Sequence, residues 1–233
     1  MLNNGKHVLC EKPLTLNSKQ CSELIELAEK KNLFLMEAVW SRCFPIYDVI
    51  KKEIESGNIG DVMQVIVSFG FKLDQVDRVS LKRYGGGTIF DLGVYVLEFA
   101  SFIFNGEEPT VIKAAGHLND DGVDVSVSAT LTYKNKRTAI VLTHSIVKLE
   151  NEAQIIGTRG TIKVPDFWCP IKIELPTGKV EIPLPKAAHL FNFYNSAGLR
   201  YEAIEARACL KAGMLLQDIL YAVRFPFTQG ELT

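Results

Sequence analysis

The stretch GKHVLCEKPLT, residues 5–15, opens the part of the chain that decides the fold. Its apolar run predicts a short buried strand over residues 7–10. The run ends abruptly in an acid, a base and a proline, which are Glu11, Lys12 and Pro13. Open α/β sheets bind their ligands at the carboxyl ends of the strands, and Pro13 restricts the backbone of Lys12 at such an end. The simpler alternative for Lys12 is a solvated surface lysine.

A helix and a second strand follow directly. Residues 16–32 predict the helix, in which Asn17 is the expected N-cap with Gln20 three residues on. Residues 33–40, LFLMEAVW, form a continuous apolar run, which is typical of a strand buried on both faces. This order predicts a β-α-β unit from a parallel sheet. Two parallel strands cannot bury both of their faces alone, so the unit predicts only a piece of such a sheet.

The remaining segments predict a different architecture. Pro45 opens a short helix that Gly57 closes, and a long strand follows at 62–71. The glycine triplet at 85–87 predicts a tight turn that runs into an apolar helix ending near residue 104. Strands then dominate, at 123–133, 138–147, 152–164 and 171–184, and the last two of these segments each include a Gly-containing turn. Two helices, expected at 199–213 and 214–224, close the chain.

The strand expected at 123–133 shows the clearest alternation. Its apolar face comprises Val123, Val125, Val127, Ala129, Leu131 and Tyr133. Its polar face comprises Asp124, Ser126, Ser128, Thr130 and Thr132. Alternation with a period of two is typical of a strand with one face in the core and one in water. Consecutive strands of this kind with short turns predict an antiparallel sheet that packs helices on one face.

Composition excludes several functional classes. The 233 residues are 47% hydrophobic and 23% charged, which is the average globular mixture, and the net charge of −1 gives no electrostatic footprint for nucleic acid or a membrane surface. No apolar run approaches a membrane span, and the start lacks the pattern of a signal peptide. The five cysteines are scattered and form no CxxC pair, so neither a disulfide framework nor a metal site is expected. We expect a reduced, cytoplasmic protein.

Three motifs together carry a resemblance. GKHVLCEKPLT, GGGTIFDLGVYVLEF and GTRGTIKV resemble the oxidoreductase family that includes glucose–fructose oxidoreductase and inositol dehydrogenase, and MEAVWSR at 36–42 points to its members that oxidise trans-dihydrodiols or D-xylose. The resemblance implies an α/β chain in which 1–40 is the C-terminal remnant of a Rossmann domain. Residues 41–233 would be a substrate-binding domain with a large, open, mostly antiparallel sheet that forms a homodimer. It also implies that most of the nucleotide-binding domain is absent, since no G-x-G-x-x-G follows a strand.

The same resemblance implies a reaction and its residues. The activity would be NADP-dependent oxidation of a vicinal diol or an aldose hydroxyl by hydride transfer. Glu11, Lys12 and Pro13 would contact the cofactor, and Lys12, Asp91 and Tyr95 would be catalytic, with Tyr95 exchanging the proton of the substrate hydroxyl. The spacing of Asp91 and Tyr95 places them on one face of the expected helix. A phenol has a pKa near 10 and needs a cation to lower it, and Lys12 could be that cation.

Structural rather than catalytic interpretations of these residues stay open. Asp91 could cap or pair, and Tyr95 could be a core aromatic of an apolar helix. The expected walls of a substrate pocket are Trp40, Arg42, Phe69, Trp168 and Phe193. For Phe69 and Phe193, an ordinary core position is an equally good interpretation. A rival hypothesis for the whole chain is a non-catalytic module that only dimerises through its sheet.

Overall fold

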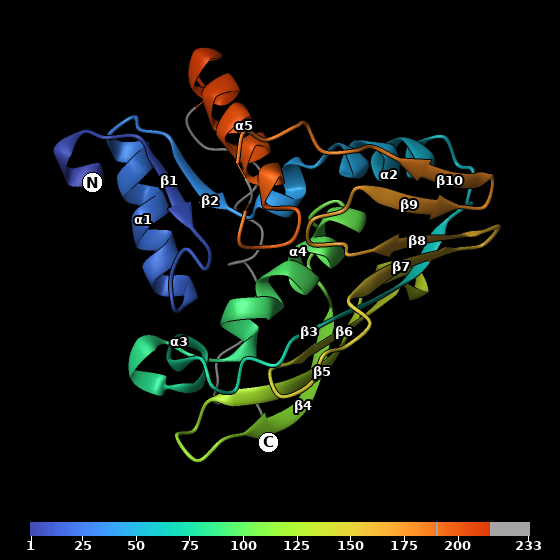
Figure 1. Ribbon diagram of the computed structural model, residues 1–233, viewed down its shortest axis with the longest axis horizontal. Coiled ribbons are helices and arrows are strands. Elements are labelled where there is room, and N and C mark those ends of the chain that lie inside the picture. The colour runs from blue at the N-terminus through green and yellow to red at the C-terminus, as the bar shows by residue number, and fades with distance from the viewer. Residues whose placement is uncertain (190, 215–233) are drawn as a thin grey trace.

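The structure is a computed structural model that describes residues 1–189 and 191–214, and its elements form an N-terminal unit and a larger part (Figure 1). The N-terminal unit contains β1 (Val8–Glu11), α1 (Ser18–Lys30) and β2 (Leu35–Ala38). The helices of the larger part are α2 (Pro45–Glu55), α3 (Asp77–Ser80), α4 (Val94–Ile103) and α5 (Leu199–Lys211). Its strands are β3 (Val62–Gly70), β4 (Val111–Leu118), β5 (Asp124–Thr132), β6 (Thr138–His144), β7 (Glu152–Gly157), β8 (Thr161–Pro165), β9 (Lys172–Leu175) and β10 (Gly178–Glu181). The helix expected at 214–224 lies, beyond residue 214, outside the described residues.

The N-terminal unit is the predicted β-α-β. β1 and β2 pair in parallel, and the side chain of Asn17 accepts a hydrogen bond from the backbone N–H of Gln20, as an N-cap does. β2 is buried throughout, as its apolar run predicts. β1 is only half-buried, with Leu9 41% exposed, because β2 covers one of its edges and α1 packs on one of its faces.

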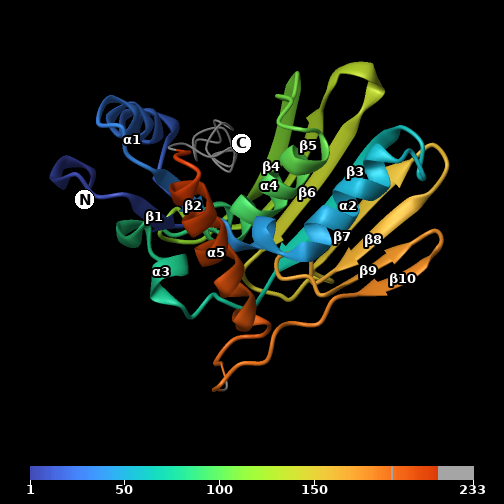
Figure 2. The same cartoon turned by 90° about the horizontal axis from the view of Figure 1, so that it is seen from above.

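The larger part is built on one eight-stranded sheet with the strand order β10-β9-β8-β7-β3-β6-β5-β4. All neighbouring strands are antiparallel except β3 and β6, which pair in parallel. α2 and α4 lie against one face, and no described helix lies on the other (Figures 1 and 2). The predicted fold class, a Rossmann segment followed by a domain with a large, mostly antiparallel sheet, is confirmed.

The expected helix at 85–104 has two parts. Gly85 and Gly87 take positive φ angles of 67° and 131°, which only glycine adopts readily. Residues Ile89–Gly93 then form a π-helical turn before α4 begins. Short π-helical turns inside helices are frequent at functional sites. This turn carries Asp91, and Tyr95 follows in the first turn of α4.

The expectation that no apolar run approaches a membrane span is wrong for one stretch, Lys82–Ile103, which is long and apolar enough by length and composition alone. Its most apolar window has a mean hydropathy of 1.3, and 78% of that window is buried inside the protein. α4 packs on β3 and β6 in the core, and this position explains why the stretch is so apolar.

α5 stands between the N-terminal unit and α2 (Figure 2) and packs against the short helical turn η2 (Trp40–Cys43). At its start, Gly198 touches the buried ring of Phe44, which Trp40 and Tyr201 hold edge-on at 5.2 and 5.4 Å. A Cβ at Gly198 would overlap that ring.

Gly198→Ala is therefore expected to lower the free energy of unfolding by about 1–3 kcal/mol, the usual cost of overpacking a core. Denaturant unfolding measures the change. Gly93→Ala is the matched control and should cost less, because its Cβ would meet only the side chain of Ile89, at 3.2 Å or more. Equal stability of Gly198→Ala and the parent would show that Phe44 moves freely.

Candidate active site

Lys12 joins the N-terminal unit to the π-helical turn. Its ammonium donates to the backbone carbonyl of Asp91 at 2.6 Å and to Asp91 Oδ1 at 3.2 Å. The Lys12 side chain is 14% exposed, and the Lys12–Pro13 peptide bond is cis. The simpler alternative of a solvated lysine is thus not what the structure shows, because Lys12 is held at the carboxyl end of β1 by two oxygen atoms of Asp91.

Asp91 is held from a second side by Arg78 on α3, whose Nη1 lies 2.5 Å from Asp91 Oδ1. Burial acts to raise the pKa of Asp91, but Lys12 and Arg78 outweigh it and hold the pKa below the ordinary aspartate value. Asp91 is therefore a carboxylate at neutral pH. Sequence reasoning missed Arg78, because it lies in a polar loop with no periodic pattern.

Tyr95 lies directly beside this pair. Its ring centroid is 4.9 Å from Lys12 Nζ, and its hydroxyl accepts a hydrogen bond from Trp40 Nε1 at 2.9 Å. The structure thus brings together Lys12, Asp91 and Tyr95, which the sequence singled out, and adds Trp40 to them. The Tyr95 side chain is not a plain core aromatic, because its hydroxyl is engaged in a polar contact.

The expected effect of Lys12 on the phenol needs a correction. Burial raises the pKa of Tyr95 above its ordinary value, and Glu11 and Asp91 add to the rise, while Trp40 opposes it. The Lys12 ammonium faces the ring and is bound to Asp91, so it does not act at the hydroxyl as the cation that was expected to lower the pKa. In this arrangement the raised pKa leaves the phenol protonated at neutral pH.

The aromatic residues divide into core and surface positions. Phe69 is 2% exposed and packs edge-on against Tyr95 at 5.4 Å, which fits the core interpretation. Trp168 is half-buried and lies 4.7 Å from the Phe69 ring. Phe193 is 80% exposed, so the structure does not bring it into a pocket wall. Of the expected pocket residues, only Trp40 contacts the Tyr95 hydroxyl.

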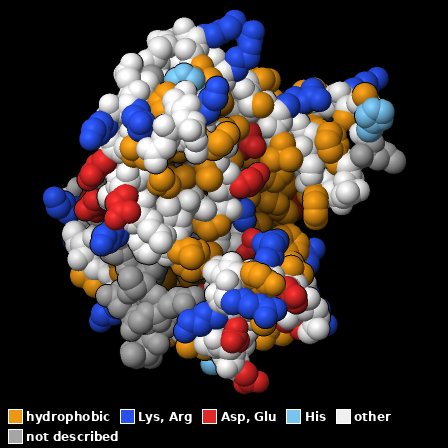
Figure 3. Space-filling view, turned by 90° about the vertical axis from the view of Figure 1, so that its left-hand side faces the viewer, with side chains coloured by type: hydrophobic (Ala, Val, Ile, Leu, Met, Phe, Trp, Pro, Cys, Tyr) orange, Lys and Arg blue, Asp and Glu red, His pale blue; other side chains and the backbone are white. Residues whose placement is uncertain are grey.

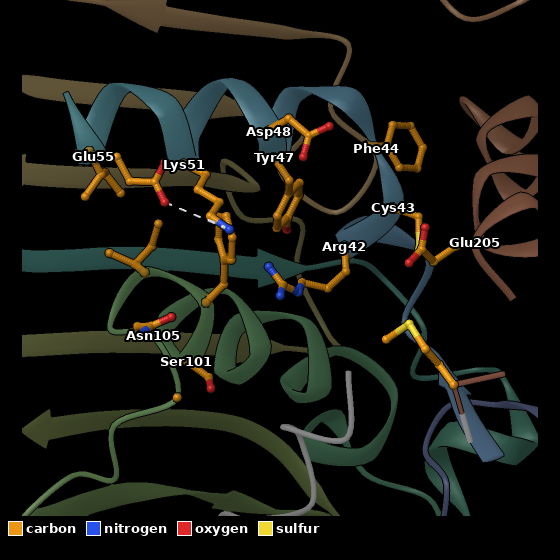
Figure 4. Close-up of a pocket in the computed structure, with 15 residues that line it drawn as sticks. Arg42, Cys43, Phe44, Tyr47, Asp48, Lys51, Glu55, Ser101, Asn105 and Glu205 are labelled. Atoms are coloured by element: carbon orange, nitrogen blue, oxygen red, sulfur yellow. Dashed lines mark ion pairs between the residues drawn. The ribbon is translucent and has the colours of Figure 1, made fainter. Parts of the chain in front are cut away.

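Arg42 points elsewhere. Its Nε lies 2.8 Å from Oε1 of the fully buried Glu98, and its guanidinium lies 4.2 Å from the ring centroid of Phe102. The side chain lines a cavity of about 560 Å³ between α2 and α4, where Figure 4 shows it beside Tyr47. Lys12, Asp91 and Tyr95 do not line this cavity. The structure holds Arg42 against Glu98 and Phe102, and its expected contact with substrate stays a prediction.

Two buried glutamates flank the site and were missed by sequence reasoning. Glu37 is fully buried in β2, and its Oε1 accepts from the backbone N–H of Leu14 at 2.8 Å, which fixes the loop after Pro13. Burial raises its pKa, against the effects of Leu14 and Lys12. Burial and the charge of Glu11 raise the pKa of Glu202, on α5, to about 7. An acid inside the apolar run LFLMEAVW was the one available signal for Glu37.

The residues present fit one end of a dinucleotide. In doubly wound sheets the cofactor lies at the carboxyl ends of parallel strands, and Glu11, Lys12 and Pro13 occupy that end of the parallel pair β1–β2. On the face that α1 and α3 present, apolar side chains gather in a hollow with acidic and basic side chains at its edge (Figure 3). Among the residues that the structure describes, no three His, Cys, Asp or Glu side chains are placed to hold a metal ion.

Comparison with known families decides the identity. Residues 47–163 match the family described as GFO/IDH/MocA C-terminal domain, and residues 1–39 match the oxidoreductase family with the NAD-binding Rossmann fold. The chain belongs to the GFO/IDH/MocA oxidoreductase family. It is 42% identical to trans-1,2-dihydrobenzene-1,2-diol dehydrogenase of Xenopus tropicalis, over 94% of this chain and 67% of the relative. The Homo sapiens protein of that name is 34% identical, over 94% of this chain and 70% of its own length.

Solved structures share the fold of this chain. Aldose-aldose oxidoreductase from Caulobacter crescentus, complexed with glycerol, superposes with a TM-score of 0.76 at 23% identity, over 96% of this chain and 68% of that one. The 3-ketoreductase KijD10 from Actinomadura kijaniata, in complex with NADP, gives 0.75 at 24% identity, over 95% and 67%. The predicted family is therefore confirmed, while the chain spans about two thirds of these proteins.

Proposed function

We propose that this chain supplies the substrate side of an NADP-dependent dehydrogenase that oxidises a vicinal diol, such as a trans-dihydrodiol, or an aldose such as D-xylose. Residues 1–40 belong to its dinucleotide-binding domain, and 41–233 form its substrate-binding and dimerisation domain. The observation that carries the proposal is the contact of Lys12 with Asp91 beside the Tyr95 hydroxyl, at the carboxyl end of a parallel strand.

Tyr95 is the proton-transfer group of the proposed reaction. NADP, when bound, supplies the acceptor for the hydride that leaves the carbinol carbon. The hydroxyl proton of the substrate passes to the phenolate oxygen of Tyr95, and the reverse reduction uses the phenol as donor. Because burial raises the Tyr95 pKa, little of the accepting phenolate is present at neutral pH, and its share grows as the pH rises. Oxidation is therefore expected to speed up toward alkaline pH, and reduction to slow down.

Lys12 and Asp91 position the reacting hydroxyl in this proposal. Lys12 is fixed by two Asp91 oxygens and can turn a further N–H toward a substrate oxygen, since an ammonium has three donors. Trp40 and Trp168 offer flat apolar surfaces that suit a dihydrodiol ring or the apolar face of a sugar. The names of the Xenopus and human relatives support a diol substrate, and the NADP bound to the 3-ketoreductase supports the choice of cofactor.

The proposal is tested with a joined enzyme, in which this chain is fused to the nucleotide-binding segment of the Xenopus tropicalis relative. Its turnover is followed as formation of NADPH, with a trans-dihydrodiol and with D-xylose as substrates. Turnover of at least one of them with NADP is expected, and little with NAD. A joined protein that binds NADP tightly but oxidises neither substrate would refute the proposed activity.

Lys12→Met is expected to lower kcat of the joined enzyme by about 10²-fold, because the substrate oxygen loses its donor. The charge of Asp91 would then be opposed by Arg78 alone, so the pKa of Asp91 should rise. Lys12→Arg should keep part of the activity, and Lys6→Met, at an exposed lysine, should keep all of it. An unchanged kcat in Lys12→Met would reduce Lys12 to a structural residue.

A non-catalytic dimerisation module remains the second candidate. The sheet face without a described helix supports it. Light scattering on the 233-residue chain, together with the substrate binding and turnover of the joined enzyme, separates the two candidates. A homodimer that neither binds substrate nor gains activity on fusion favours the module.

All five cysteines are unpaired, which supports a cytoplasmic location for either candidate.

A further inference from the structure

Asp124 occupies a position that its sequence pattern does not predict. Alternation in 123–133 places it on the polar face, but it is only 1% exposed. The cause is a β-bulge: Ser126 pairs with His117 and Asp124 with Leu118, so β5 carries one extra residue, Val125, at this point. Bulges re-aim side chains and are frequent beside active sites. Here the bulge turns the Asp124 carboxylate into the domain.

The carboxylate of Asp124 meets the turn that starts the helix of the candidate active site. Asp124 Oδ2 accepts from Thr88 Oγ1 at 2.6 Å and from the backbone N–H of Ile89 at 2.9 Å. The Thr88 hydroxyl also lies 2.8 Å from Thr143 Oγ1. Because Thr88 gives its one proton to the carboxylate, Thr143 is the donor in that second bond. Thr88 and Thr143 are both buried, so the network is shielded from water.

The backbone of Gly87 lies directly against this carboxylate. A Cβ at Gly87 would overlap Asp124 Oδ1, and the φ angle of 131° also requires glycine. The carboxylate thus contacts residues 87, 88 and 89 in succession, and Ile89 is the first residue of the π-helical turn. The negative charge lies at the N-terminal end of the helical segment, where the helix dipole favours it.

We propose that Asp124 is a positioning residue for the reaction proposed above: by anchoring residues 87–89 from β5, it sets where Asp91 and Tyr95 stand relative to Lys12. Asp91 follows Ile89 by two residues, and its backbone carbonyl and carboxylate both bind Lys12. A shift of this turn along the sheet would separate those oxygens from an ammonium that comes from the N-terminal unit. A misplacement of about 1 Å can cost about 10²-fold in rate.

The first test uses the 233-residue chain and does not depend on the proposed activity. The pKa of Asp91 is followed by carboxyl ¹³C NMR, with Asp91→Asn to assign the signal. In Asp124→Ala the Asp91 pKa is expected to rise toward the ordinary aspartate value, because the carboxylate moves away from Lys12. Asp124→Asn keeps one acceptor oxygen, so in this variant the Asp91 pKa should rise less than in Asp124→Ala. Asp120→Asn, in the exposed turn before β5, is the matched control and should leave the Asp91 pKa unchanged.

The second test uses the joined enzyme and rests on the proposed function. Asp124→Asn is expected to lower kcat at least tenfold while KM changes little, and Asp124→Ala to lower it further. A lower melting temperature with an unchanged Asp91 pKa would overturn the proposal, and so would an unchanged kcat. If the parent joined enzyme is inactive, the proposed function fails, and the NMR comparison alone then decides on Asp124. If Asp124→Ala does not fold, Asp124→Asn carries both measurements.

Discussion

Tyr95→Phe is expected to lower kcat of the joined dehydrogenase by about 10²–10⁴-fold, the usual contribution of a general acid–base group. The change removes one oxygen atom, which accepts from Trp40 Nε1, and leaves the ring on Phe69 and under Lys12. Packing should therefore persist. The affinity for NADP should change far less than the rate, since the hydroxyl serves the substrate.

The matched control for this prediction is Tyr84→Phe. Tyr84 is 57% exposed and lies just before the glycine turn, so loss of its hydroxyl should leave kcat unchanged. Circular dichroism and melting temperature check that both variants fold. A near-normal kcat in Tyr95→Phe would make Tyr95 a structural residue and would remove the proposed proton transfer.

Arg42→Met is expected to cost about 3–5 kcal/mol of folding stability at pH 9, because removing one partner of a buried ion pair leaves the other charge uncompensated. Glu98 is fully buried, and Arg42 Nε is 2.8 Å away. Burial raises the pKa of Glu98 to about 8, against the effect of Arg42. Above that pH the carboxylate is charged and needs the guanidinium.

The pH dependence of the Arg42→Met effect has a definite sign. In the folded state Glu98 holds its proton to a higher pH than in the unfolded chain, so unfolding releases a proton between about pH 4.5 and 8 and stability falls as pH rises. Without Arg42 the fall in stability extends to higher pH, so Arg42→Met should lose more stability at pH 9 than at pH 6. Adding Glu98→Gln to Arg42→Met should recover part of the stability lost at pH 9. Arg207→Met, on the exposed side of α5, is the matched control, and an equal loss in both would refute the buried pair.

Local patterns predicted the elements of the fold well, because burial imposes a period. The capping signal at Asn17 and the apolar run at 33–40 gave the β-α-β unit, and the alternation of 123–133 gave a strand with its apolar face inward. The parallel pairing of β3 with β6 has no local signature, since partner choice across the sheet depends on contacts distant in sequence. The register shift that buries Asp124 is invisible for the same reason.

The site was predictable only in part. Lys12, Asp91 and Tyr95 stood out through their places at a strand end and on one helix face, and the structure brings them together. Arg78 and Glu37 contact the site through tertiary interactions that no spacing in the sequence predicts. The contact of Arg42 with Glu98 was not predicted, because Glu98 lies in an apolar helix whose pattern indicates only a core position. The phenol pKa depends on how completely the fold covers Tyr95, which a sequence does not state.

Transfer of deuterium tests the central claim, that the chain contributes the substrate side of a hydride-transferring dehydrogenase. The joined enzyme is given NADP with D-xylose deuterated at C1, or with a trans-dihydrodiol deuterated at its carbinol carbons, and the reduced nucleotide is examined by NMR. We predict one deuterium on the nicotinamide ring for each product molecule, with a rate that Tyr95→Phe lowers by the factor given above. Binding of NADP and of the substrate without any deuterium in the nucleotide would contradict the account.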